Sequence, residues 1–209
     1  MAQRRELIAE VADNLKKRGF EVHIAATPEE GKATALALIP KGDSVCWGGS
    51  ETVRELGIIE ALRAAGKNKL IDRAAASTPE ETAEIMRSGL LADTFVTSVN
   101  AVSRDGWLVN IDGTGNRVAA TIYGPRNIVL VVGVNKLVDG GLDDAIYRAR
   151  NVAAPLNTKR LGRKTPCAVT GKCADCLAPD TICSQFVLTR YCKPAHRIKL
   201  VLIDSELGY

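Results

Sequence analysis

Four of the six cysteines in this 209-residue chain lie in one stretch, TPCAVTGKCADCLAPDTICSQF, from Thr165 to Phe186. They are separated by five, two and six residues, in the order Cys167, Cys173, Cys176 and Cys183. The CxxC pair has the spacing at which two thiolates reach one metal centre, and the turn-forming residues on either side allow the loop to fold round it. The pattern therefore predicts a metal site with four thiolate ligands.

The identity of the metal depends on the spacing. Zinc ribbons usually contain two CxxC pairs, whereas this stretch has one, and irregular spacing round a single CxxC favours an iron–sulfur cluster, in particular a 4Fe-4S cluster. Zinc, or a loop that is unmetallated or disulfide-bonded, remains an alternative. Cys192, separated from Cys183 by eight residues, is the substitute ligand if Cys167 or Cys183 does not bind. Nearby basic residues would offset the negative charge of a thiolate-ligated cluster: Arg163, Lys164, Lys172 and Arg190.

A glycine turn offers a second kind of chemistry. In VCWGGSETVRELG, Gly48 and Gly49 follow an expected strand, and Ser50 stands where it can cap the next helix. Two glycines let the backbone approach a ligand closely, and free backbone N–H groups favour an anion. We expect a small carboxylate or phosphate to bind here. The alternative is a tight turn with no ligand.

Short polar side chains and glycines crowd the run NIDGTGNR, between two apolar strands. The carboxyl ends of neighbouring parallel strands share one edge of a sheet, so this run is expected to complete the anion site. Asp112 is the candidate proton-handling or ligand-orienting carboxylate, and an Asx turn is the alternative for it. Lys136 follows an expected strand and could neutralise an acid near the same edge, but a solvated lysine is the favoured interpretation. The further ligand-binding candidates are Asn110, Gly113, Thr114 and Asn116.

Alternating strands and helices must position these groups. The segments 20–26, 43–49, 68–74, 93–99, 106–112, 127–134 and 196–204 have the composition of strands, and residues 127–134 are apolar enough for a buried central strand. Helices are predicted after Thr27 and after Ser77 or Thr78, where a cap residue is followed by proline, and over residues 140–157. The segment 50–66 is expected to form one helix or a broken pair. This order predicts an α/β fold with a mostly parallel sheet.

Composition places limits on the class of protein. A hydrophobic content of 46% supports a real core, and we expect one domain over residues 1–209 with a loop-rich, cysteine-rich insertion at 163–193. The first residues show helical periodicity without a signal-peptide core, and no apolar run could span a membrane, which predicts a cytoplasmic protein. A net charge of +4 is too diffuse to indicate specific nucleic-acid binding.

The run NAVSRDGWLVNIDGTGNRVAATIYGPRNIVLVVGVNKLV, with GGSETVRELG and the tail RYCKPAHRIKLVLIDSELGY, resembles the LUD domain of lactate-utilisation proteins. The resemblance covers nearly the whole chain. It implies a Rossmann-like three-layer α/β/α sandwich related to sugar-phosphate isomerases and CoA transferases. It also implies a role, as a subunit or accessory, in the oxidation of lactate to pyruvate alongside iron–sulfur partner subunits. An oligomer is compatible with it.

The same run is similar to the signature of methylthioribose-phosphate isomerases, with Asn110 and Thr114 at matching positions. Asn100 stands where those isomerases use a catalytic aspartate, so it is a second catalytic candidate beside Asp112. An amide cannot act as a general base, which argues against isomerase chemistry. Two hypotheses remain: an iron–sulfur redox subunit that binds a small anion, or a non-redox binding or scaffold protein with a structural zinc loop.

Overall fold

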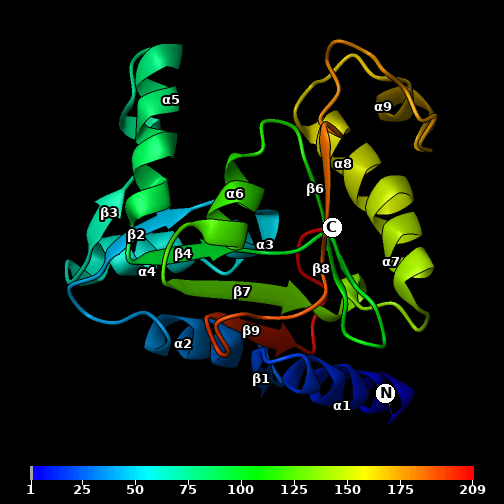
Figure 1. The fold of residues 1–209 in the computed structure, drawn as a ribbon, viewed down its shortest axis with the longest axis horizontal. Helices are drawn as coiled ribbons and strands as arrows, with labels where there is room; N and C mark the ends of the chain where they lie inside the picture. The colour runs from blue at the N-terminus through cyan, green and yellow to red at the C-terminus, as the bar shows by residue number, and fades with distance from the viewer. Residues whose placement is uncertain (1) are drawn as a thin grey trace.

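Six parallel strands form the main sheet of the computed structural model, which describes residues 2–209. Every neighbouring pair in this sheet is parallel. Figure 1 shows the strands crossing the molecule. Their order is β1 (Glu21–Ala25), β9 (Ile198–Ile203), β7 (Asn127–Gly133), β4 (Thr94–Thr97), β2 (Ser44–Trp47) and β3 (Lys69–Ile71).

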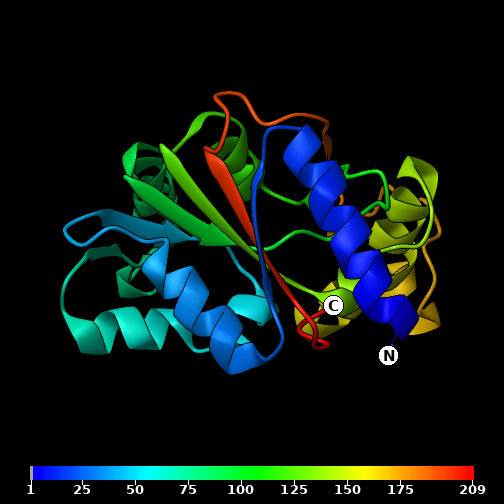
Figure 2. The ribbon, with the colours of Figure 1, turned by 90° about the horizontal axis from the view of Figure 1, so that it is seen from below.

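Helices cover both faces of this sheet. One face packs against α1 (Ala2–Lys17) and α6 (Asn116–Tyr123), and the other against α2 (Pro28–Ala37), α3 (Glu51–Glu55) and α4 (Ile58–Ala65). The β7 side chains alternate accordingly: Ile128 and Leu130 join the first core cluster, while Val129 and Val131 join the second. Figure 2 shows α1 and α2 on opposite sides of the strands. The predicted three-layer α/β/α sandwich is confirmed.

Local sequence signals account for several boundaries. The Thr27 hydroxyl accepts a hydrogen bond from the Glu30 amide at the start of α2, and Thr78 does the same for Glu81 at the start of α5 (Pro79–Ser88). Gly57, with a φ of 59°, separates α3 from α4, so the expected helix is a broken pair. The central strand β7 is buried along its whole length, as predicted.

A second, antiparallel sheet stands beside the first. It is formed by β5 (Ala101–Val102), β6 (Leu108–Asp112) and β8 (Gln185–Thr189), in that order. The segment 163–193, which the sequence predicts to be loop-rich, also contains β8 and the short helix α9 (Pro166–Thr170). β8 is an edge strand whose Phe186 and Leu188 side chains remain exposed, so its pattern is not that of a core strand.

One continuous helical run covers the second sheet. It comprises α7 (Leu142–Arg148), a π-helical segment (Ala149–Ala153) and α8 (Ala154–Arg160), and its alanines pack against Val109 and Ile111 of β6. Figure 1 shows this run parallel to β6 and β8, with the C-terminus between it and the main sheet. Short 3₁₀ turns complete the structure: Arg73–Ala75, Gly89–Leu91 and Val134–Lys136. No helix within residues 2–209 is long and apolar enough to cross a membrane.

Candidate functional site

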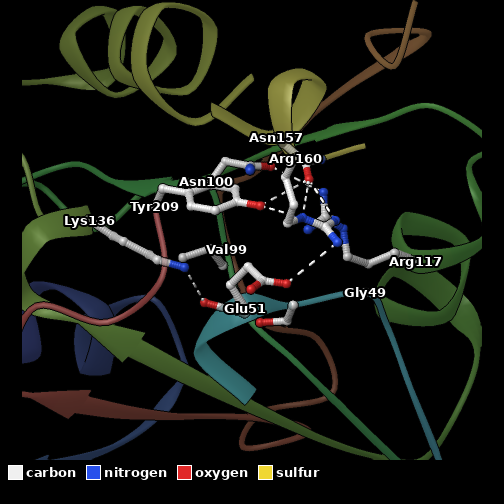
Figure 3. Close-up of a pocket in the computed structure, with 11 residues that line it drawn as sticks. Gly49, Glu51, Val99, Asn100, Arg117, Lys136, Asn157, Arg160 and Tyr209 are labelled. Carbon is white, nitrogen blue, oxygen red and sulfur yellow. Dashed lines mark hydrogen bonds and ion pairs between the residues drawn. The ribbon is translucent and has the colours of Figure 1, made fainter. Parts of the chain in front are cut away.

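The main sheet has a topological switch point between β2 and β4. These strands are neighbours, yet the chain continues from β2 to the edge strand β3 and from β4 to β7 on the other side. Loops that diverge in this way leave a crevice at the carboxyl ends of the strands, which is where open α/β sheets bind ligands. A cavity of about 30 Å³ lies at this point, large enough for a water or a carboxylate head group. Figure 3 shows the residues that line it: Gly49, Ser50, Glu51, Ser98, Val99, Asn100, Arg117, Lys136, Asn157, Arg160 and Tyr209.

Lys136 is a buried residue of this switch-point pocket. The residue is only 3% exposed, and its Nζ donates hydrogen bonds to Thr52 Oγ1 at 2.7 Å and to Ser98 Oγ at 3.0 Å. Burial, with Arg148 and Arg117 nearby, lowers the pKa of Lys136 to about 7. None of its hydrogen-bond partners is a carboxylate. Lys136 is therefore a buried amine with no ion-pair partner among residues 2–209, and Glu55 is the carboxylate that acts on it from a distance.

Arg117 enters the pocket from the first turn of α6. Its guanidinium donates to the Asn100 side-chain oxygen at 3.2 Å and to the Ile111 carbonyl, and its Nε lies 3.6 Å from an Asp112 oxygen. Burial lowers the pKa of Arg117 against the opposing effect of Asp112. These contacts fix the guanidinium in place, which is the property needed to orient an anionic ligand.

Residues from α8, α3 and the C-terminal segment form the outer wall. Arg160 lies 3.5 Å from Glu51 and donates to Asn157 and to the Tyr209 hydroxyl. Figure 3 shows these side chains converging above the glycine turn. The same Glu51–Arg160 pair also borders an open groove of about 360 Å³ that extends past Trp47 and Arg73. A small ligand could thus place its head group in the pocket and the rest of its body in the groove.

The charges of the lining residues favour an anion. Lys136, Arg117 and Arg160 line the pocket with basic groups, and Glu51 is the carboxylate among the lining residues. Glu51 also forms an ion pair with Arg54, whose Nη2 lies 2.6 Å from Glu51 Oε2. The excess of cationic groups in a partly enclosed site attracts negative ligands, so the pocket suits a carboxylate or a phosphate.

The four cysteines of the 165–186 stretch line one cavity of about 270 Å³ on the far side of α8. Polar groups surround them: Arg150 Nη2 donates to Cys173 Sγ at 3.4 Å, and the hydroxyls of Thr158 and Thr165 lie 3.5 Å and 3.4 Å from Cys167 Sγ. Burial raises the pKa of the Cys183 thiol, and the neighbouring Cys167 adds to this. All six cysteines of the chain are free of disulfide bonds.

The spacing of these thiols bears on which metal centre they could bind. Within residues 2–209, no three histidine, cysteine or acidic side chains converge closely enough to hold a single metal ion. A tetrahedral zinc draws its sulfurs to roughly 2.3 Å from one point, whereas a 4Fe-4S cluster takes one thiolate on each iron and so needs a wider ring. Four cysteines that line one cavity of this size are compatible with a cluster that takes one thiolate on each iron.

The sequence of nearly the whole chain matches a known protein family. Residues 8–203 match the sequence family of the LUD domain. The chain belongs to the LUD domain family. This family is related to lactate utilisation, which confirms the resemblance found in the sequence. No curated protein matches the chain at a significant level.

Solved structures agree with this LUD domain at the level of fold. A DUF162 family protein from Deinococcus radiodurans shares 14% identity and a TM-score of 0.55, over 96% of this chain and 97% of that one. Ribose 5-phosphate isomerase A from Neisseria gonorrhoeae is 18% identical over 56% of this chain and 57% of that chain, with a TM-score of 0.35. The 5-methylthioribose 1-phosphate isomerase from Pyrococcus horikoshii OT3 is 15% identical over 77% and 50%, with a TM-score of 0.40. The last two likenesses are too distant to support a conclusion about this chain.

The LUD domain brings some of the expected anion-site residues together. Gly49, Ser50 and Asn100 line the switch-point pocket. Gly48 lies behind them, where a Cβ atom would come within 2.8 Å of Thr97 Oγ1 and 3.3 Å of Arg117. A side chain at position 48 would thus disturb the guanidinium, which explains the glycine in physical terms.

The other expected anion ligands lie elsewhere. Asn110 is buried in β6, and Gly113 packs against the backbone of Ile182. Thr114 belongs to the turn before α6, and Asn116 lines a separate cavity beside Trp47. None of the four lines the switch-point pocket: β6 and the turn after it adjoin the second sheet, and Asn116 lines the separate cavity between the end of β2 and α5.

Asp112 and Asn100 have structural partners. One Asp112 oxygen accepts hydrogen bonds from the amides of Thr114 and Gly115, and the other from the amide of Val118, so the carboxylate caps α6. This geometry favours the Asx-turn alternative for Asp112. The Asn100 side-chain oxygen accepts from the Ile111 amide at 2.8 Å and from Arg117, so Asn100 holds an arginine that faces the ligand.

Cys192 does not lie with the other four cysteines. It is fully buried in the main core, its Sγ lies 3.2 Å from the Pro194 carbonyl, and the Ile198 amide donates to it. It is absent from the residues that line the cysteine cavity. The expectation that Cys192 could replace Cys167 or Cys183 as a ligand is therefore not supported by its position.

Sequence reasoning missed several lining residues of the pocket, among them Arg117, Arg160 and Tyr209. Arg117 directly follows the NIDGTGN run and was within reach of the motif, since the first turn of a helix after a strand faces the sheet edge. Arg160 lies at the end of α8, and Tyr209 follows the last strand. Only the tertiary packing of those two segments brings them to the pocket. The expectation of a solvated Lys136 is wrong, because Thr52, Ser98 and Gly208 enclose its amine.

We expect Lys136 to make this LUD domain more stable as the pH rises. Its folded pKa of about 7 lies below the ordinary value of 10.5, so the unfolded chain binds more protons between these two values. Stability should thus increase over this window, by at most about 1.4 kcal/mol per pH unit for one proton. The measurement is urea unfolding of the wild type and of Lys136→Met across the window. Parallel pH profiles for the two proteins would contradict the shifted pKa.

Proposed function

We propose that this LUD domain is an iron–sulfur protein of the cytoplasm that serves the oxidation of lactate to pyruvate, as a subunit or accessory that works with iron–sulfur partner subunits. It would hold a 4Fe-4S cluster at Cys167, Cys173, Cys176 and Cys183, and a small carboxylate at the switch-point pocket. The observation that carries the proposal is the convergence of these four cysteines on one donor-lined cavity. The family relation to lactate utilisation supports the choice of substrate.

The cysteine side of the proposal rests on what surrounds the thiols. A bound cluster would supply one-electron transfer. The chain itself would contribute the thiolates, the hydroxyls of Thr158 and Thr165, and the Arg150 guanidinium, which offset the negative charge of the cluster and its ligands. The ion pair of Arg150 with Asp175 ties the loop between Cys173 and Cys176 to the helical run.

The substrate side rests on the charge of the pocket. Two basic groups, Lys136 and Arg117, line the pocket, and Asp112 is the carboxylate that pairs with Arg117. A carboxylate from lactate or pyruvate would supply a second negative charge. Arg117 would fix the orientation of the carboxylate, since Asn100 and Asp112 already hold its guanidinium. Gly49 leaves the backbone open to the ligand.

A single helix separates the two sites. Asn157 and Arg160 on α8 line the switch-point pocket, whereas Ala154 and Thr158 on the same helix line the cysteine cavity. The diameter of an α-helix with its side chains is about 10 Å, so the substrate and a cluster would lie close to one another. This proximity is what one expects if the two sites serve one reaction.

Metal analysis of anaerobically purified protein tests the proposal. We expect brown protein with about four iron and four sulfide per chain. Zinc at about one per chain, without sulfide, would contradict the proposal and support the alternative of a non-redox binding or scaffold protein. Protein purified in air provides the control, because a cluster exposed to oxygen would bleach while a zinc site would not change colour.

A further inference from the structure

The amine of Lys136 has an arrangement that the binding of an anion alone does not require. Its nitrogen carries Cε and makes hydrogen bonds to Thr52 Oγ1 and Ser98 Oγ, which occupy three of the four tetrahedral positions. Lys136 also lines the pocket, so the remaining position is the one available to a ligand. In Figure 3 the nitrogen of Lys136 ends inside the pocket, below Arg160 and Tyr209.

The surroundings hold this amine in its reactive form. The charged groups that act on it are Arg148 from α7 and Arg117 from α6, which disfavour its protonation, and Glu55 from α3, which has a smaller opposing effect. With a pKa of about 7, a large fraction of Lys136 is unprotonated at neutral pH. An unprotonated lysine in a desolvated pocket is a nucleophile toward carbonyl carbon. The two hydroxyls then accept its two N–H bonds, and the lone pair takes the position that faces the ligand.

We propose that Lys136 forms an imine with a small 2-oxo acid whose carboxylate is bound by Arg117 and Arg160. The proposal rests on the anion pocket of the proposed function and defines the substrate class of that same site. In a 2-oxo acid the carbonyl carbon is bonded directly to the carboxylate carbon. A carboxylate held by the two guanidinium groups therefore places the carbonyl carbon in the same pocket that Lys136 lines.

The reaction balances without any further reactant. The Nζ lone pair attacks the carbonyl carbon, so a C–N bond forms and the carbonyl opens to a carbinolamine. The nitrogen then gives up both of its protons, the oxygen leaves as water, and a C=N bond replaces the C=O bond. No electron is gained or lost. The hydroxyls of Thr52 and Ser98, which already contact Nζ, can carry the protons.

The pocket is small, which restricts the acid. Its volume of about 30 Å³ accepts the carboxylate and carbonyl end, and any longer chain must pass the Glu51–Arg160 pair into the adjoining groove. Pyruvate meets this requirement. Lactate has the same carboxylate but no carbonyl, so it can bind without forming a covalent bond. The site would then distinguish a 2-oxo acid from the corresponding 2-hydroxy acid by chemistry rather than by shape.

Reductive trapping tests this proposal on the full-length chain. The purified protein is incubated with pyruvate and sodium cyanoborohydride, which reduces an imine to a stable secondary amine, and is then analysed by intact mass and peptide mapping. We expect one adduct per chain, on Lys136, with a yield that rises as the pH increases through about 7. Incubation with lactate should give no adduct. Peptide mapping of the wild type identifies the site without the need for a variant.

Two variants provide matched controls. Lys136→Arg keeps a cation in the pocket but removes the amine, so we expect at least a tenfold loss of adduct. Lys199→Arg changes a half-buried lysine, which contacts Asn127 at the opposite end of the sheet, and should trap as the wild type does. Comparable melting temperatures of the variants would show that folding is unaffected.

The outcomes separate the imine from the proposed function. Pyruvate that binds in calorimetry without forming an adduct, or adducts scattered over surface lysines, would overturn the imine and leave the anion pocket standing. Absence of binding by both lactate and pyruvate would overturn the anion pocket and the imine together. The iron and sulfide content, measured on the same preparation, judges the cluster independently of both.

Discussion

Cys176→Ser is expected to yield colourless protein with less than a tenth of the wild-type iron. Cys176 lines the cysteine cavity and belongs to the CxxC pair, so its loss removes one of four ligands from a site whose chain segment has little other structure. The main sheet and its two cores do not include this residue. Circular dichroism should therefore show the helix and strand content of the wild type, while proteolysis should cleave the 172–184 loop faster.

Cys192→Ala is the control for this experiment. Its thiol packs in the main core and does not reach the cavity, so the variant should keep its iron while losing some stability, about 1 kcal/mol for a small buried group. The modular view of the cysteine segment fails if Cys176→Ser retains full iron, or if the whole chain unfolds with the loss of metal.

Asp112→Ala is expected to lower the free energy of unfolding by about 3–5 kcal/mol, the range measured when one partner of a buried ion pair is removed. The carboxylate accepts from three backbone amides at the start of α6 and lies beside the buried guanidinium of Arg117. Alanine would leave these amides without a partner and the charge of Arg117 less well balanced. Urea unfolding at neutral pH measures the loss directly.

Asp112→Asn separates the cap from the charge. Its side-chain oxygen can still accept from the Thr114 and Gly115 amides, so we expect it to lose less stability than the alanine variant. If Asp112 only caps α6 and supports Arg117, the asparagine variant should bind lactate within a few-fold of the wild type. A complete loss of ligand binding or turnover at unchanged stability would instead favour the proton-handling role.

Local sequence signals were enough to predict much of the fold. The cap and proline pairs at Thr27 and Thr78 begin helices by bonds between neighbours in the chain, and β7 is apolar because helices cover both of its faces. β8 could not be found in this way. It is held at an edge by pairing with β6, more than seventy residues earlier in the sequence. Its outward-facing side chains, Phe186 and Leu188, are apolar, so the strand does not show the alternation of polar and apolar residues that marks a half-buried strand.

The candidate sites also contain some residues that local sequence predicts and others that only tertiary packing reveals. The glycine turn and the CxxC pair can be read from the sequence, because backbone freedom and short-range ligand spacing are local properties. The basic side chains of the pocket cannot, since Arg160 and Lys136 look like ordinary exposed residues until α8 and the segment around Gly208 pack over the end of β7. Asn110 and Asn116 show the converse error: polar residues beside glycines lay near one another in the sequence but faced different elements.

The π-helical segment at Ala149–Ala153 acts as a phase shift in the long helical run. A π turn holds one residue more than an α turn would place there, and each residue of an α-helix turns the chain by about 100°. Everything that follows, including Asn157 and Thr158, is thereby rotated relative to α7. Asn157 faces the switch-point pocket and Thr158 faces the cysteine cavity, so a rotation of α8 about its axis would move the lining of both sites at once. A change of a single residue in this turn would misalign both sites together.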